Sequence, residues 1–161
     1  MPPFEYIASI TDRYQRLGYQ TYRWFRAEEP PAFVPLSKPL SECKLGVVST
    51  AGVYVKGQVA YFYKDDTSFR AIPKSTPVSE IRFSHITENY LPDARRDANC
   101  VFPIEPLRRL EAEGVVGQVA DELFSCMGGI YSQRRVREEL IPALTAEFAR
   151  QEVDVVLLVP L

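Results

Sequence analysis

The chain has 161 residues, of which 46% are hydrophobic and 25% are charged, and its formal net charge is −2. These values predict one globular domain with its own core, and they give no electrostatic case for binding nucleic acid or an anionic membrane. The sequence has neither the segments of a signal peptide nor an apolar run near the ~18 residues of a membrane span.

The cysteine and histidine content bounds the chemistry further. Three cysteines are an odd count, and Cys43, Cys100 and Cys126 lack the spacing of metal ligands. We therefore expect a reduced, cytoplasmic setting. His85 is the single histidine, so one chain cannot supply a multi-histidine metal site. We expect no metal and no cofactor.

The N-terminal region predicts a helix followed by an arm. Apolar residues recur at spacings of three and four, which is typical of an amphipathic helix: Phe4, Ile7, Ile10, Tyr14 and Leu17. Gly18 is placed to end that helix. Residues 19–42 are rich in aromatics and prolines, and prolines disfavour regular hydrogen bonding. We expect a single α/β domain over residues 1–161, with residues 1–43 forming the helix and an arm packed on the domain.

Two strands are expected in the first half of the remaining chain. Residues 45–50 form the first clear apolar strand, and Ala51-Gly52 follows as a small-residue turn. Residues 53–79 are expected to be irregular. Residues 81–86 alternate between apolar and polar side chains, which predicts a second strand.

The second half predicts helices. Residues 103–110 begin one helix, with proline tolerated in its first turn and Gly114 at its end. Ser132 is a candidate N-cap for another. A stripe with four-residue spacing follows it: Val136, Leu140, Leu144 and Phe148. Pro142 should kink or split that helix near Leu140.

The last seven residues, 155–161, form an apolar run that predicts a strand buried on both faces. Strands alternating with helices favour a three-layer α/β fold of flavodoxin-like or Rossmann-like type, with a mainly parallel sheet and helices on both faces. A strand buried on both faces belongs in the middle of a sheet. Either the strand order makes the last strand central, or a C-terminal strand and helix that cover it are absent, and we expect the latter.

Candidate site residues lie at strand ends, where parallel α/β proteins bind ligands. Ser49, Thr50 and Gly52 allow close backbone approach and add hydroxyl donors, although a tight turn would use the same residues. His85 near the end of the second strand could act as an acid, a base or an orienting donor, or be a structural histidine. Asp97 and Asn99 could contribute, although we prefer loop anchoring or helix capping as the explanation for both residues.

Several of these stretches, in this order, resemble the selenoprotein B family of glycine, sarcosine, betaine and D-proline reductases in its short bacterial form. The resembling segments are residues 44–52, 83–85, 102–110, 113–117, 124–129 and 153–160. In such proteins the final strand leads into a cysteine or selenocysteine, two residues and a cysteine, at a helix N-terminus that lowers the pKa of the reactive group.

The resemblance implies an oxidoreductase that cleaves a small amine-type substrate reductively with a thiol or selenol. It implies no catalytic residue within the chain, because the redox motif would begin directly after Leu161. A selenocysteine codon read as stop, or a deliberate truncation, would produce such an ending, and this chain alone should be inactive. Ser49, Thr50, Gly52 and His85, with Asp97 and Asn99, would form the wall of the substrate pocket.

The resemblance also implies partners, and it leaves alternatives open. A thioredoxin-like thiol donor would return the enzyme to its reduced form. An exposed sheet edge would allow a homo-oligomer. The alternatives to an enzyme are a non-catalytic subunit, or a small-molecule-binding α/β module that completes its sheet with a partner.

Overall fold

The structure is a computed structural model of the chain, and it describes residues 5–21, 23–32 and 34–161. The chain divides into two compact units, Met1–Pro35 and Leu36–Leu161. In the first unit, helix α1 spans Tyr6–Arg16, and Gly18 follows it at φ +75°. The expected helix and its glycine terminator are therefore confirmed, although Phe4 lies outside the described residues. The packing of the arm on the domain stays a prediction.

Aromatic contacts organise the first unit. The ring of Tyr6 meets that of Trp24 edge-on at 5.8 Å, and Tyr14 meets Tyr19 in a similar way at 6.1 Å. Edge-to-face pairs of this kind are a favoured aromatic geometry. The segment after α1 is thus joined to the helix by its own aromatic side chains.

A five-stranded sheet forms the centre of the second unit. Its strands are β1 (Lys44–Ser49), β3 (Phe69–Pro73), β5 (Gln118–Val119), β6 (Glu122–Cys126) and β7 (Val155–Val159). Strand β1 pairs in parallel with β5, β6 and β7, whereas β3 pairs antiparallel with β6. Because a strand has two edges and β7 pairs with all of Leu45–Ser49, β5 and β6 share the other edge of β1.

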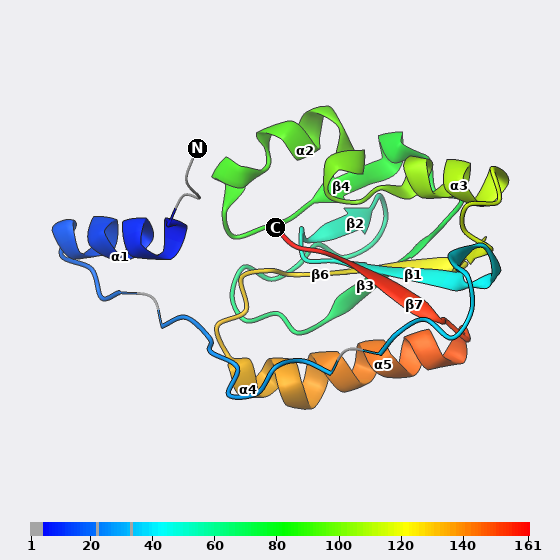
Figure 1. Cartoon of the computed structure of the whole chain (residues 1–161). Coiled ribbons are helices and arrows are strands. Elements are labelled where there is room, and N and C mark those ends of the chain that lie inside the picture. The colour runs from blue at the N-terminus through cyan, green and yellow to red at the C-terminus, as the bar shows by residue number, and fades with distance from the viewer. Residues whose placement is uncertain (1–4, 22, 33) are drawn as a thin grey trace. The chain divides into compact units, whose positions relative to one another are not determined.

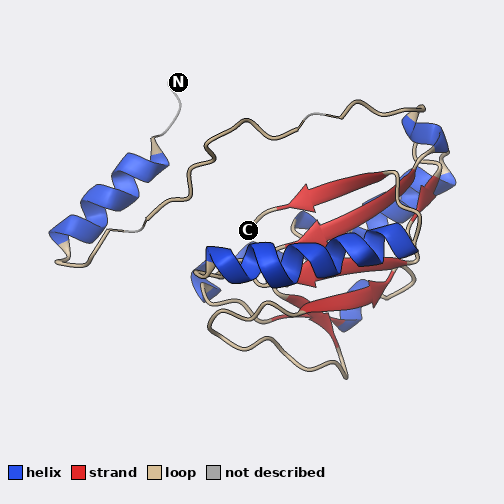
Figure 2. Ribbon diagram, turned by 90° about the horizontal axis from the view of Figure 1, so that it is seen from below, coloured by secondary structure: helices blue, strands red, loops and turns tan. Residues whose placement is uncertain are grey.

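Helices cover both faces of this sheet, as Figure 1 shows. Helices α2 (Pro92–Arg96) and α3 (Ile104–Ala112) lie on one face. On the other lie α4 (Gln133–Arg135), a π-helical segment (Val136–Leu140) and α5 (Ile141–Arg150), which run as one rod across the sheet in Figure 2. The three-layer α/β fold is thus confirmed. Among the described residues, no helix is both long and apolar enough to cross a bilayer.

Each face of the sheet has its own core. Phe102, Ile104 and Val119 are fully buried in the core beneath α2 and α3. On the other face, Phe124 meets Phe69 at 5.4 Å and Phe148 at 5.2 Å, both edge-on. The stripe predicted after Ser132 therefore supplies the second core, with Leu140 and Leu144 buried in it.

The proline in this helix does not break it. Pro142 lies in the first turn of α5, directly after the π-helical segment. A π-turn adds a residue to the helical repeat, so the missing N–H of Pro142 falls where the hydrogen-bond pattern already changes. The predicted change near Leu140 thus takes the form of a π-segment.

The expectation that residues 53–79 are irregular is wrong, whereas the strand expected at residues 81–86 is present over Ile81–Phe83. The segment contains strand β2 (Val53–Val55) as well as β3, so it is not irregular. The predicted second strand is β4 (Ile81–Phe83), which pairs antiparallel with β2 in a separate two-stranded sheet. Alternation signals one buried face, and it does not identify the partner strand. Short 3-10 turns lie at Leu40–Glu42, Val78–Glu80, Glu88–Tyr90 and Ala98–Cys100.

Strand β7 is at the edge of the sheet, which corrects the expectation of a strand buried on both faces. Leu157 is 37% exposed and Leu158 is 69% exposed. Val155, Val159 and Leu161 still pack against the core beneath α2 and α3. The apolar composition of β7 therefore exceeds what its neighbours in this sheet cover.

Candidate functional site

The carboxyl ends of β1, β6 and β7 meet the segment after β4 at one point. A Cβ placed on Gly128 would lie 2.8 Å from the carbonyl oxygen of Thr50, 2.9 Å from His85 Nε2 and 3.0 Å from the oxygen of Leu161. Residues more than 30 positions apart along the chain thus surround one glycine. The structure thus brings Thr50 and His85, two of the predicted site residues, next to the same glycine, and their role in a pocket stays a prediction.

Thr50 connects the ends of two parallel strands. Its backbone N–H donates to the carbonyl oxygen of Val159 at 3.0 Å. Its Oγ1 accepts a hydrogen bond from the backbone N–H of Leu161 at 2.9 Å. Thr50 therefore holds the residues that follow β7 against the end of β1.

Ser49 is fully buried and serves the framework. Its Oγ accepts from the backbone N–H of Ala51 at 3.2 Å, which tightens the turn after β1. The hydroxyl of Ser125 on β6 donates to the carbonyl oxygen of Ser49 at 3.0 Å and accepts from Val53 N–H at 2.8 Å. Ser125 thereby links β1, β6 and β2 from a position that was not among the predicted site residues.

Gly52 brings the segment that follows β4 and carries His85 up to the turn after β1. It adopts φ +64°, and a Cβ there would lie 2.0 Å from the carbonyl oxygen of Ser84. The carbonyl of Gly52 accepts from Ser84 N–H at 2.9 Å, and its own N–H donates to Cys126 at 3.0 Å. Only glycine combines this backbone angle with so close an approach.

His85 is buried, with 8% of its surface exposed. The backbone N–H of Thr87 donates to His85 Nδ1 at 3.2 Å, and the Thr87 hydroxyl lies 2.8 Å from the same atom. Because a backbone N–H can only donate, Nδ1 is an acceptor, and the neutral ring carries its proton on Nε2. Within the described chain, Nε2 is buried without a hydrogen-bond partner. Burial lowers the pKa of His85, which favours this neutral form.

Asp97 and Asn99 lie apart in a capping network. The carboxylate of Asp97 accepts from the backbone N–H and the side-chain amide of Asn99, at 2.9 and 3.0 Å. Asn99 Nδ2 also donates to Glu105 at 2.9 Å, and Asn99 Oδ1 accepts from the Glu105 N–H at 3.1 Å. These contacts fix the start of α3. A pocket role for Asp97 and Asn99 stays a prediction.

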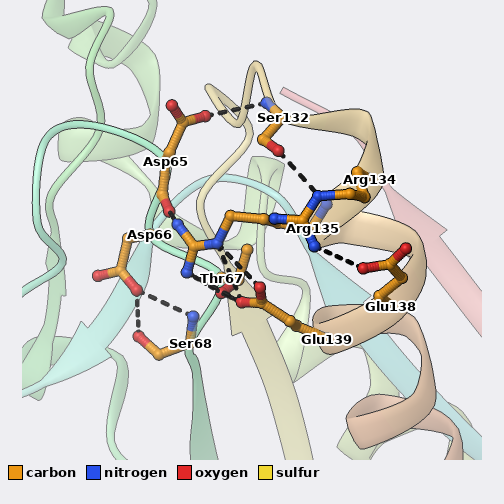
Figure 3. Close-up of polar contacts among 9 residues, drawn as sticks. All are labelled: Asp65, Asp66, Thr67, Ser68, Ser132, Arg134, Arg135, Glu138 and Glu139. Atoms are coloured by element: carbon orange, nitrogen blue, oxygen red, sulfur yellow. Dashed lines mark hydrogen bonds and ion pairs between the residues drawn. The ribbon is translucent and has the colours of Figure 1, made fainter.

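A polar cluster fixes the segment that carries Gly128 (Figure 3). The carboxylate of Asp65 accepts from the N–H of Tyr131 at 2.7 Å. It also accepts from the N–H of Ser132 at 3.0 Å, as drawn in Figure 3. Arg135 donates to the Asp65 carbonyl at 2.6 Å and to the Thr67 hydroxyl at 2.9 Å. Ser132 Oγ accepts from Arg135 N–H at 3.4 Å, which confirms Ser132 as an N-cap. The β2–β3 loop thus holds the chain between β6 and α4.

The cysteines have environments that oppose nucleophilic chemistry. Cys126 is buried, and burial raises its pKa to about 11. Cys43 is buried and donates to the carbonyl oxygen of Pro39 at 3.3 Å. Cys100 is exposed, and its pKa is raised by desolvation and by the nearby carboxylates of Asp97 and Asp93. Since the thiolate is the reactive form, the raised pKa values disfavour nucleophilic chemistry at Cys100 and Cys126.

The opposite, amino end of the sheet has a hollow of about 420 Å³ lined partly by Lys38, Lys44 and Asp154. Asp154 accepts from Lys38 Nζ and from the backbone N–H of Lys44, both at 2.7 Å. Lys44 Nζ donates to the Gln151 carbonyl oxygen at 2.9 Å. These charged groups are paired with protein atoms, so we assign them a structural role at the amino end of the sheet. Within the described ranges, no group of three or more His, Cys, Asp or Glu side chains could hold a metal.

Two neighbours of His85, Gly128 and Thr87, were not among the predicted site residues. The glycine pair Gly128-Gly129 was a sequence signal for one of them, since glycines allow close approach of the backbone. Gly128 fits that signal directly. Thr87 had no signal of its own. Its role depends on the local turn after β4, where its backbone and hydroxyl both reach His85 Nδ1.

Comparison with known proteins shows which family the chain resembles in sequence. Residues 30–160 match the family described as Glycine/sarcosine/betaine reductase selenoprotein B (GRDB). The chain is similar to the D-proline reductase subunit gamma of Acetoanaerobium sticklandii, with 33% identity over 141 residues. That match covers 88% of this chain and 58% of the relative, so the chain spans little more than half of that protein. No solved structure matches the chain.

Proposed function

This chain belongs to the glycine/sarcosine/betaine reductase selenoprotein B family, and from that membership we propose that it is part of an oxidoreductase that cleaves a small amine-type substrate reductively. In the proposed reaction a selenolate or thiolate attacks the substrate carbon, the carbon–nitrogen bond breaks, and the amine leaves with a proton. One thiol of a dithiol donor then attacks the chalcogen while the carbon leaves with a proton, and the second thiol frees the enzyme's selenol or thiol as the donor becomes a disulfide. A thioredoxin-like protein in the cytoplasm fits that role.

The observation that carries this proposal is the family match over residues 30–160, and the cysteines of residues 1–161 bear on where the reactive group would lie. Cys43 and Cys126 are buried, and the pKa of Cys100 is raised. A reductase of this kind needs a thiol or selenol with a lowered pKa. We therefore place the reactive group outside these residues, directly after Leu161, where Thr50 already holds the backbone against the end of β1.

The test restores that group. The DNA beyond the codon for Leu161 is sequenced, and the extended protein is produced with cysteine or selenocysteine at the encoded position. With dithiothreitol as reductant, it is assayed for the primary amine that forms when the ring of D-proline opens, and for amine release from glycine, sarcosine and betaine. The matched control has serine at the reactive position. Activity in the extended protein and none in the control supports the proposal. No downstream cysteine or selenocysteine, or no redox chemistry with any thiol, would overturn it.

A second candidate function follows from the exposed edge of β7. Leu158 is 69% exposed on a strand that pairs only through its β1 edge among the described strands. Such an edge can add a strand from a partner or from a second copy. The chain would then be a non-catalytic subunit or a small-molecule-binding module that completes its sheet in a complex. Light scattering measures whether the chain associates with a second copy. A stable monomer, in which Leu158 stays exposed, would count against a sheet completed by another chain.

A further inference from the structure

We propose that the β2–β3 loop, residues 56–68, is a docking site for a protein partner that presents an apolar hollow rimmed by carboxylates. Three large apolar side chains of this loop are exposed: Val59 by 79%, Phe62 by 62% and Tyr63 by 64%. The ring centroids of Phe62 and Tyr63 lie 4.7 Å apart, so the two rings form one aromatic ridge. The proposed reaction uses no residue of this loop, so the two proposals fail separately.

The residue before the ridge anchors the loop to the domain. Tyr61 is only 5% exposed, and its hydroxyl donates to the carbonyl oxygen of Ser125 at 2.5 Å. The guanidinium of Arg70 lies 4.2 Å from the centre of the Tyr61 ring, and its Nε donates to the Val59 carbonyl oxygen at 2.7 Å. The backbone is therefore fixed beside Tyr61, while the side chains of Val59 and Phe62 stay in solvent.

A carboxylate fixes the ridge from its other end. Asp66 accepts from the backbone N–H of Phe62 at 2.8 Å and from that of Ser68 at 2.9 Å, and Figure 3 shows its contacts with Ser68. Binding costs less when the contacting segment is already ordered, because little conformational entropy is lost. The aromatic ridge is thus a preorganised surface, which is what a docking element requires.

The outward charge of the loop is basic, because its carboxylates are used internally. Asp65 and Asp66 both accept backbone N–H groups. Lys56 and Lys64 are exposed, and neither forms an ion pair within the described part of the chain. Complementary charge steers partners together and fixes their register. Two ammonium groups beside an aromatic ridge therefore fit an apolar hollow with carboxylates at its rim.

Size and charge favour a different protein as the occupant. Aromatic side chains offer about 150–250 Å² each, so the exposed ridge has about 300–400 Å² of apolar surface, which is the range of functional patches on monomers. The chain has a formal net charge of −2, which gives an anionic bilayer no overall attraction. Two copies meeting ridge to ridge about a two-fold axis would bring their lysines together, and like charges oppose that pairing.

The first test identifies the occupant by photochemical crosslinking. The full chain carries the photoreactive residue benzoylphenylalanine in place of Phe62 or, as a control, in place of Tyr90, which is 59% exposed at the end of the turn Glu88–Tyr90. Each protein is irradiated in an extract of its own organism. We expect an adduct with one other protein at position 62 and none at position 90. No adduct, the same adducts at both positions, a lipid adduct or an adduct of two copies of this chain would each overturn the proposal.

The second test measures whether the ridge and its charge carry the binding. The captured protein is purified, and its affinity for the chain is measured by calorimetry. Phe62→Ala and Lys64→Glu should each weaken binding about tenfold, and the effect of Lys64→Glu should shrink at high salt. Arg96→Glu reverses an exposed charge on α2 and is the matched control, which should bind as the wild type does. Urea unfolding checks that each variant is folded, and wild-type affinity in the Phe62 or Lys64 variant would refute the docking site.

Discussion

The side-chain oxygen of Thr50 accepts the backbone N–H of Leu161 at 2.9 Å, across 111 positions of sequence. The same residue donates its own N–H to Val159 at 3.0 Å. Two parallel strands thus end in register because one threonine bonds with both its backbone and its side chain. The backbone at the end of β7 is therefore held in position by the end of β1. A binding or catalytic site at the strand ends requires such a fixed backbone.

Thr50→Val should loosen this junction, because valine has nearly the same shape but accepts no hydrogen bond. We expect a loss of about 0.5–1.5 kcal/mol in the free energy of unfolding, measured in urea, and faster amide exchange at Leu161. Thr50→Ser keeps the hydroxyl and is the matched control. Unchanged exchange at Leu161 in the valine variant would show that the bond does not hold the end of β7.

Gly52→Ala should be among the most damaging single changes in the domain. Alanine there would combine φ +64° with a Cβ only 2.0 Å from the Ser84 carbonyl, and both constraints are backbone. We expect a loss of about 3 kcal/mol or more from strain and overpacking together. Gly57→Ala is the control, since Gly57 also has positive φ, +98°, but has nothing within 4 Å of its added Cβ.

Equal stability losses for the Gly52 and Gly57 variants would mean that the strained backbone angle alone causes the loss, with no contribution from the contact with Ser84. A larger loss at Gly52, measured by urea unfolding, would show that glycine is required by the close approach between the turn after β1 and the Ser84 carbonyl. Because Ser84 precedes His85, the position of the imidazole should also move in the Gly52 variant, which its single pair of 15N signals would report.

The elements that could be predicted from sequence are those set by local periodicity. The stripe containing Leu140 and Leu144 identified a helix and its buried face, because helical spacing is a local property. The position of Ser49 and Thr50 at a strand end was predictable for the same reason. Pairing was not: β4 alternates as a sheet strand does, yet it joins β2, and alternation does not select a partner.

The candidate site was predictable only in part, because its geometry depends on distant residues. His85 could be singled out as the one histidine, whereas its approach to Gly128 and Leu161 depends on the ends of β6 and β7. The edge position of β7 was also hidden. Apolar composition describes what a strand could bury, and Leu158 shows that the neighbours in this sheet do not bury all of it.

The three thiols should differ sharply in reactivity. Cys100 is exposed and should be alkylated first in the native protein at pH 8, although more slowly than a free cysteine because its pKa is raised. Cys126 should resist, since burial raises its pKa to about 11 and its thiolate is scarce below that pH. Mass spectrometry after iodoacetamide treatment reads out each site, and all three should react in denaturant. Early labelling of Cys126 in the native state would contradict its burial.

His85 should make the folded domain less stable as the pH falls. Burial lowers its pKa in the folded state from the ordinary value of 6.5, so the unfolded chain binds the proton more readily. Its contribution is therefore fully present above pH 6.5 and is lost as the pH falls from there through the lower folded pKa. Urea unfolding of wild type and His85→Gln between pH 7.5 and pH 5 isolates this effect, because carboxylates such as Asp66 and Glu111 titrate in both proteins. The wild type should lose more stability than the glutamine variant over this range, and parallel curves would show that His85 is as easily protonated in the folded protein as in the unfolded chain.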